Sequence, residues 1–156
     1  MPDTMTLTRS KDVIKKELAR SRLSEDIATL DKKRMIKAAW HKGMTQVEIA
    51  EALGIKQSSV SIAIKRAKDV AEPRQGFSGE TPYEICQRYF IKQITKKQLI
   101  SELSQWEYIK PSTTDGYDGL LVDPPGTFRE VERAVIKGLI EPGVYETVIT
   151  LLRQKD

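Results

Sequence analysis

Residues 46–65 read Gln-Val-Glu-Ile-Ala-Glu-Ala-Leu-Gly-Ile-Lys-Gln-Ser-Ser-Val-Ser-Ile-Ala-Ile-Lys. In this stretch, Ala50 is a small residue at a point where two crossed helices would nearly touch, and Gly54 follows at the turn between them. Apolar residues fall where such a pair needs a core, at Ile49, Leu53, Ile55, Val60 and Ala63. The rest of the second helix is mostly polar. The pattern therefore predicts a helix-turn-helix whose second helix can lie in the major groove of DNA.

Local signals mark the ends of both helices. Thr45 and Glu48 have the spacing of a capping box, in which each side chain accepts a hydrogen bond from a backbone N–H at the helix start. The first helix is expected to run to Leu53. Gly54 suits a left-handed turn because it has no Cβ atom to clash with the backbone. The second helix is expected over residues 57–70.

The composition favours a soluble globular protein of one or two small domains. Of the 156 residues, 39% are hydrophobic and 31% are charged, which does not suit an intrinsically disordered chain. No apolar run approaches the roughly 18 residues of a membrane span, and no signal peptide is expected. The single cysteine, Cys86, cannot form an internal disulfide, so an intracellular, reducing compartment is the simpler expectation.

Positive charge is concentrated in the part of the chain that carries the motif. The net charge is +4, but residues 1–74 hold 16 Lys and Arg against 10 Asp and Glu, whereas residues 75–156 hold 10 against 12. The first part is therefore +6 and the second is −2. This split supports contact with a DNA backbone, although an ordinary solvated surface can have the same composition.

Turn signals divide the chain into three parts. We expect a DNA-binding domain over residues 1–72, a linker over 73–80 and a helical domain over 81–156. The linker holds one proline and two glycines and has no helical periodicity. Ahead of the motif, the predicted segments are a frayed tail over 1–8, a basic helix over 10–22 and a second helix that starts at Ser24 and ends near Gly43.

The C-terminal domain is predicted to contain two helical hairpins. Capping boxes mark three helix starts, at Thr81 with Glu84, Thr95 with Gln98, and Thr127 with Glu130. The hairpins join residues 82–93 to 96–104 and residues 128–137 to 142–153. Between them, residues 106–126 lack a helical signal, and their aromatic side chains predict a long loop that is ordered across the helices. The predicted fold class is all-α.

The motif resembles the DNA-binding motif of lambdoid phage repressors and Cro proteins. The residues that match the Cro motif are Gln46, Ala50, Leu53, Gly54, Gln57, Ser58, Ala63 and Ile64, with Val60 as a conservative replacement. The resemblance covers about 20 of the 156 residues and does not reach residues 75–156. It implies a DNA-binding module in a bacterial cell or phage-infected host, where the protein would be cytoplasmic and associated with the nucleoid.

The resemblance implies roles for the residues of a DNA interface. Gln57 and Ser58 would contact base edges or phosphates, since glutamine can pair with the N6 and N7 atoms of adenine. Gln46 would brace Gln57. Ile62 departs from the family, because a polar base-reading residue is expected there; it either contacts a thymine methyl group or faces the protein. The full candidate set is Thr45, Gln46, Lys56, Gln57, Ser58, Ser59, Ser61, Ile62, Lys65 and Arg66, with the three basic residues placed to meet phosphates.

Other chemistry is not predicted. His41 is the only histidine, and one histidine gives neither a zinc site nor a catalytic dyad. Cys86 has no histidine in its domain. Asp115, Asp118 and Asp123 miss the alternating spacing of a calcium-binding loop. We therefore expect no metal, no cofactor and no enzyme activity.

The sequence thus predicts a transcriptional regulator, most simply a repressor of phage or mobile-element type that binds double-stranded DNA. One recognition helix reads about 4–5 base pairs, so we expect a homodimer on a two-fold site and no membrane association. Two alternatives keep DNA binding: an antitoxin-like autoregulator whose residues 81–156 bind a partner protein, and a DNA-packaging or partition subunit. In a further alternative, residues 46–65 are a hairpin that only packs into a core.

Overall fold

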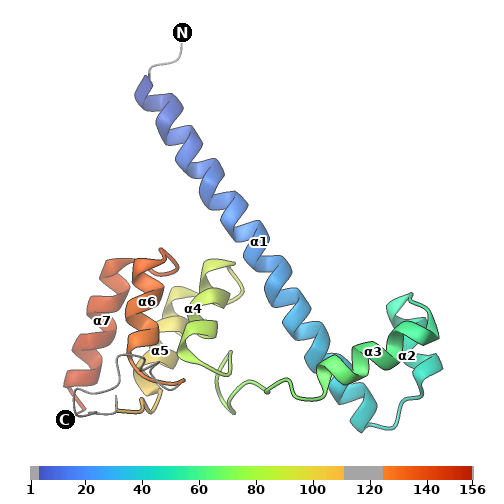
Figure 1. Ribbon diagram of the computed structural model, residues 1–156. Helices are drawn as coiled ribbons and strands as arrows, with labels where there is room; N and C mark the ends of the chain where they lie inside the picture. The colour runs from blue at the N-terminus through green and yellow to red at the C-terminus, as the bar shows by residue number, and fades with distance from the viewer. Residues whose placement is uncertain (1–3, 111–124, 156) are drawn as a thin grey trace, which may run out of the picture. The chain divides into compact units, whose positions relative to one another are not determined.

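The computed structural model describes residues 4–110 and 125–155, apart from the side chains of 5–9. Within these ranges it contains seven α-helices, one isolated parallel bridge between Ile109 and Thr127, and no strand. The helices are α1 (Thr4–His41), α2 (Gln46–Leu53), α3 (Gln57–Ala67), α4 (Pro82–Phe90), α5 (Lys96–Gln105), α6 (Arg129–Ile136) and α7 (Pro142–Arg153) (Figure 1). The all-α prediction is confirmed. None of these helices combines the length and apolar character that crossing a membrane requires.

Contacts divide the chain into two compact units, Met1–Glu72 and Pro73–Asp156. In the first unit, α3 packs against both α1 and α2. In the second unit, α4 packs against α5 and α6, and α7 also packs against α5 and α6. Each unit has its own cluster of buried apolar side chains.

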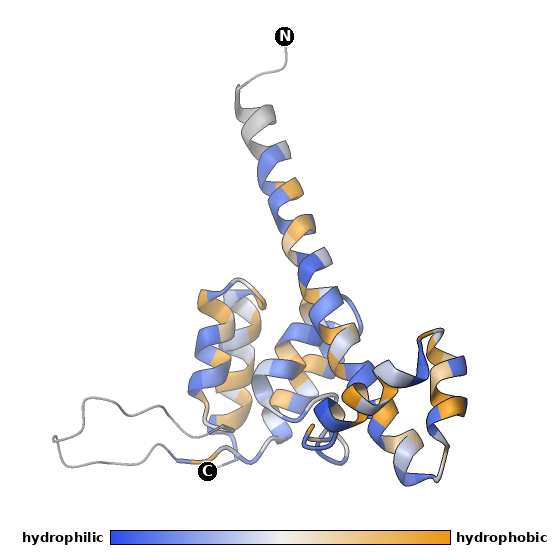
Figure 2. Ribbon diagram, turned by 45° about the vertical axis from the view of Figure 1, so that its right-hand side comes forward, coloured by the Kyte–Doolittle hydropathy of each residue, from blue (hydrophilic) through white to orange (hydrophobic). Residues whose placement is uncertain are grey.

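Helix α1 is one continuous helix of 38 residues, about 57 Å long at 1.5 Å per residue. The prediction of a frayed tail over 1–8 and two separate helices is wrong, since the helix begins at Thr4 and passes through Ser24 without a break. The Ser24 hydroxyl caps no helix start, because it donates to the carbonyl of Arg20 at 2.8 Å, one turn earlier. Hydrophilic and hydrophobic residues are interleaved along the helix (Figure 2). Gly43, expected just beyond its end, has a φ of 86°.

The start of α2 and the turn between α2 and α3 both have the predicted local geometry. The Thr45 hydroxyl accepts a hydrogen bond from the N–H of Glu48 at 3.2 Å, and the Glu48 carboxylate accepts one from the N–H of Thr45 at 2.8 Å. This reciprocal pair confirms the capping box. Gly54 has a φ of 65° and a ψ of 32°, the left-handed conformation that glycine adopts at low cost. Helix α3 ends at Ala67, earlier than the predicted Val70.

The core of the first unit is small. Ile49, Ala50 and Val60 are buried and bring α2 against α3. Partly buried apolar residues pack around them, at Ala39, Met44, Leu53 and Ile64. The prediction that Ile55 belongs to this core is wrong, since it is 40% exposed. Ile55 directly follows the left-handed turn, and Ile64 of α3 packs against the core instead.

Two side chains of α1 hold the chain that follows α3. Arg34 Nε donates to the carbonyl of Ala71 at 2.9 Å, and Lys37 Nζ donates to the carbonyl of Val70 at 2.8 Å. The Arg34 side chain is also 3.8 Å from the carboxylate of Asp31. These bonds supply partners to carbonyls beyond the end of α3, so they fix that end of the helix against α1.

Helices α4 to α7 surround the larger core of the second unit. Its buried residues are Ile85, Cys86, Leu99, Leu103, Trp106, Val131, Ala134, Ile140, Val144 and Val148. The predicted loop over 106–126 is anchored at its start, because the Tyr108 hydroxyl donates to the carbonyl of Leu103 at 2.6 Å and its ring meets Phe128 edge-on at 5.1 Å. Residues 111–124, which form most of that loop, lie outside the described residues.

In two of the predicted capping boxes of the second unit, the threonine caps the start of a helix. The hydroxyls of Thr81 and Thr95 accept from the N–H groups of Glu84 and Gln98, at 3.1 Å in each case. Glu84 uses its carboxylate differently from the prediction, since it pairs with Arg88 at 3.0 Å. Both members of this ion pair are buried, so each provides the other with the partner that a buried charge needs.

The third predicted capping box, at Thr127, is not formed. Phe128 precedes α6, and no side chain caps this helix. Thr127 is 1% exposed and takes part in the bridge with Ile109, so its side chain lies in the packed interior. The Glu130 carboxylate instead accepts a hydrogen bond from the backbone N–H of Gly126.

Replacing Gly54 with alanine should lower the free energy of unfolding by about 1–2 kcal/mol, because an L-residue is strained in a left-handed conformation. A Cβ atom at Gly54 would meet no atom within 4 Å, so the cost comes from the backbone alone. Gly143→Ala is the matched control, since its Cβ atom also meets nothing and α7 requires no left-handed backbone there. This control should be neutral or stabilising. Urea unfolding followed by circular dichroism measures both, and equal changes would contradict the turn at Gly54.

Candidate nucleic-acid interface

Helix α3 has two faces with different surroundings. Val60 and Ala67 are fully buried, and Ala63 and Ile64 are half-buried beside them. These positions recur every three or four residues, so they line one side of the helix. The exposed residues of the opposite side are Ser58, Ser59, Ile62, Lys65 and Arg66, with the half-buried Ser61 next to them. The helix therefore packs against α1 and α2 through one side, and we call the other side the outward face.

The N-terminal end of α3 is open. Lys56 precedes the helix with an extended backbone and makes no side-chain cap. Lys56, Gln57 and Ser58 are all exposed. The first N–H groups of a helix and the positive end of its dipole favour a negatively charged group. This end of α3 can therefore receive a phosphate oxygen while Gln57 stays accessible to a base.

Positive charge lies at both ends of the outward face. Lys65 and Arg66 are in the last turn of α3, and Lys56 is just before its first turn. The helix itself contains no acidic residue. A surface of this kind gains electrostatic attraction from a phosphate backbone, and the exposure of the side chains keeps their own desolvation cost low.

The structure places Thr45 and Gln46 at the start of α2, with Thr45 at the N-cap position. The Thr45 hydroxyl is occupied in the capping box with Glu48. Gln46 is half-buried, and no hydrogen bond joins it to Gln57 among the described residues. The bracing contact that the phage-repressor resemblance implies is therefore not formed in the structure.

Ile62 lies on the outward face and is 54% exposed. Its neighbours on the helix surface, three and four positions away, are Ser58, Ser59, Lys65 and Arg66. The alternative in which Ile62 faces the protein is therefore excluded. The residue type alone favoured burial, because isoleucine is found in protein cores more often than on surfaces.

The remaining candidates for chemistry have other roles. His41 is exposed in the last turn of α1. Burial raises the pKa of the Cys86 thiol to about 12, and the charge of Glu130 adds to this effect. A neutral, buried thiol is a poor nucleophile. Among the described residues, no cluster of three or more His, Cys, Asp or Glu side chains is placed to hold a metal; the three aspartates of 111–124 lie outside that part of the chain.

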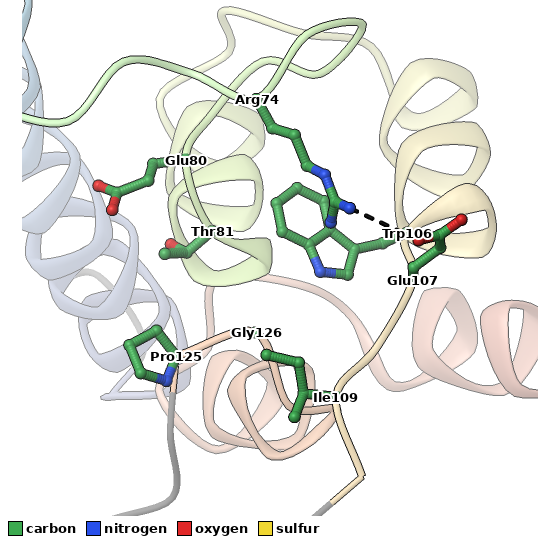
Figure 3. A pocket seen from close by; sticks show the side chains of 8 residues that line it. All are labelled: Arg74, Glu80, Thr81, Trp106, Glu107, Ile109, Pro125 and Gly126. Atoms are coloured by element: carbon green, nitrogen blue, oxygen red, sulfur yellow. Dashed lines mark ion pairs between the residues drawn. The ribbon is translucent and has the colours of Figure 1, made fainter.

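The second unit has a pocket of about 280 Å³ that sequence reasoning missed (Figure 3). Its lining residues come from separate segments: Arg74, Glu80, Thr81, Trp106, Glu107, Ile109, Pro125 and Gly126. The Arg74 guanidinium lies 4.7 Å from the ring centroid of Trp106 and 3.6 Å from the carboxylate of Glu107. The guanidinium thus already has an aromatic and an acidic partner. No local pattern signals this pocket, because only tertiary folding brings its segments together.

Comparison with known proteins gives no match. No protein-family model fits the chain, and neither the curated proteins nor the solved structures include one with significant similarity to it. The outward face of α3 combines exposed hydroxyl groups with the basic side chains of Lys65 and Arg66.

The raised pKa of Cys86 should make the protein less stable in alkali. The pKa of the thiol is near its ordinary value of 9.0 in the unfolded chain and about 12 in the folded protein, so its contribution to stability is fully present below pH 9 and is lost as the pH rises toward 12. Between pH 9 and 10.5, the free energy of unfolding should fall by up to about 1.4 kcal/mol per pH unit more steeply than in Cys86→Ala. Urea unfolding at several pH values measures the two slopes. Identical slopes would contradict the buried, neutral thiol.

Proposed function

We propose that this protein binds double-stranded DNA in a sequence-specific manner and regulates transcription, with the outward face of α3 and the exposed Gln57 at the start of this helix as its DNA-contacting surface. The observation that carries the proposal is the division of α3, which packs through Val60 and Ala67 and exposes polar and basic side chains on the other side. A helix held in this way can enter a major groove without losing its contacts with the core. Occupation of a promoter would exclude the polymerase, so repression is the simplest outcome.

The distribution of residues on α3 favours this function over a hairpin with only a structural role. Packing requires the buried side of the helix, and the first unit satisfies that requirement with Val60 and Ile64. It does not require an uncapped N-terminal end with Gln57 exposed, or Lys65 and Arg66 on the outward face. Base-edge contact explains the exposed glutamine, and phosphate contact explains the two cations.

Sequence-specific recognition by this surface would need two copies of the chain. One recognition helix reads about 4–5 base pairs, whereas a two-fold dimer places two such helices about 34 Å apart on successive turns of DNA. We therefore include a homodimer in the proposal. The second unit is the candidate for self-association or for binding a protein partner, because the proposal assigns α3 to DNA.

Replacing Gln57 with alanine tests the proposal on duplexes that the full-length protein has selected from random DNA. Selection should enrich a motif with two-fold symmetric halves. Gln57→Ala should then weaken binding to that motif by about 1–3 kcal/mol and should weaken binding to random DNA less, because a lost base contact affects only the cognate sequence. Titration by fluorescence anisotropy measures both affinities.

Gln75→Ala is the matched control, since Gln75 is an exposed glutamine outside the first unit. It should leave both affinities unchanged. Equal losses on selected and random DNA in the Gln57 variant would remove Gln57 from base recognition. Failure of the protein to enrich any sequence would refute sequence-specific binding.

A further inference from the structure

The outward face of α3 has an aliphatic side chain at its centre. Ile62 is 54% exposed, and every residue three or four positions from it on the helix is polar. Two of these neighbours are serines and two are cations, at Ser58, Ser59, Lys65 and Arg66. Because such neighbours surround Ile62, a surface that contacts both the serines and the cations must also cover Ile62.

Packing within the protein does not account for this isoleucine. The buried cluster of the first unit receives Val60 and Ile64 from α3, and Ile62 is not among the residues packed against it. A single exposed aliphatic residue is common on protein surfaces and has no meaning by itself. Ile62, however, lies at the centre of a face whose other side chains carry hydroxyl groups or positive charges. It therefore determines which ligand group can lie against that centre.

The edges of DNA bases offer one apolar group in the major groove, the C5-methyl group of thymine. The other groups on these edges are hydrogen-bond donors and acceptors or ring C–H groups, such as the C5–H of cytosine, that bury less apolar surface than a methyl group. An isoleucine pressed against a donor or acceptor would leave that group without a partner and would cost free energy. Contact with a methyl group avoids this cost and removes apolar surface from water.

We propose that Ile62 makes the DNA site require a pyrimidine with a 5-methyl group at the base that it faces. This inference rests on the proposed function, because it assigns the chemistry of one position on the same surface. Thymine supplies the methyl group in ordinary DNA. 5-Methylcytosine presents the same group at the same ring position, so it satisfies Ile62 where unmodified cytosine does not.

Replacement of single thymines by deoxyuridine tests this requirement, because it removes only the methyl group. The probe is a duplex that the full-length protein has selected from random DNA. One thymine in each half-site should be sensitive, with affinity about fourfold lower after its replacement, the effect expected for one methyl group that no longer becomes buried. At that position, a 5-methylcytosine pair should bind more tightly than an unmodified cytosine pair.

Ile62→Ser should bind the thymine and deoxyuridine duplexes equally. Because Ile62 is exposed, this variant should keep the melting temperature of the parent protein. Met35→Ser is the matched control, since Met35 is a large apolar residue of α1 that is 64% exposed and is not part of the outward face. The control should keep the fourfold difference between the two duplexes.

Three results would overturn the inference. A selected site in which no thymine is sensitive would refute the requirement and leave the proposed function standing. A sensitive thymine that remains equally sensitive in Ile62→Ser would assign the methyl contact to another residue. The absence of any selected site would overturn the inference together with the proposed function.

Discussion

The position of α3 depends on the left-handed backbone at Gly54 and on the close packing of Ala50 next to it. Ala50 is 7% exposed, and its carbonyl accepts a hydrogen bond from the N–H of Ile55 at 3.1 Å, directly across the turn. A larger side chain at Ala50 would push α3 away from α2, whereas a side chain at Gly54 would strain the left-handed backbone without meeting a neighbour. At the other end, Arg34 and Lys37 of α1 hold the chain that follows α3. The helix is thus fixed at both ends, and its outward face needs no further support.

Local signals predicted the start of α2 and the turn that follows it well, because the geometry of both depends on neighbouring residues. The capping box at Thr45 joins groups three positions apart, and the left-handed turn depends on Gly54 alone. The same kind of signal was misleading at Ser24, because a serine hydroxyl can cap a helix or bond to the carbonyl one turn earlier inside a helix. At Thr127 the prediction failed because α6 begins after Phe128, one residue later than expected, and the buried Thr127 forms a backbone bridge with Ile109.

The candidate site was predictable in its periodicity but not in its details. The repeat of apolar positions indicated which side of α3 would be buried, and the exposed residues follow from that. The orientation of Ile62 needed the structure, because the burial of Val60 and Ile64 fixes which side of the helix faces the core. The predicted contact between Gln46 and Gln57 was not found, since it depends on the relative rotation of two helices. The pocket beside Trp106 could not be predicted from the sequence, because the segments that line it are separated along the chain and come together only in the folded protein.

The most direct test of the account is to map which residues a selected DNA duplex contacts. Titration of the duplex into ¹⁵N-labelled full-length protein, followed by amide chemical shifts, locates the contact surface on the protein. The account predicts that the largest shifts occur at residues 56–66, with small changes over 82–105 and 129–153. Large shifts confined to those two segments of the second unit, with residues 56–66 unchanged, would contradict it.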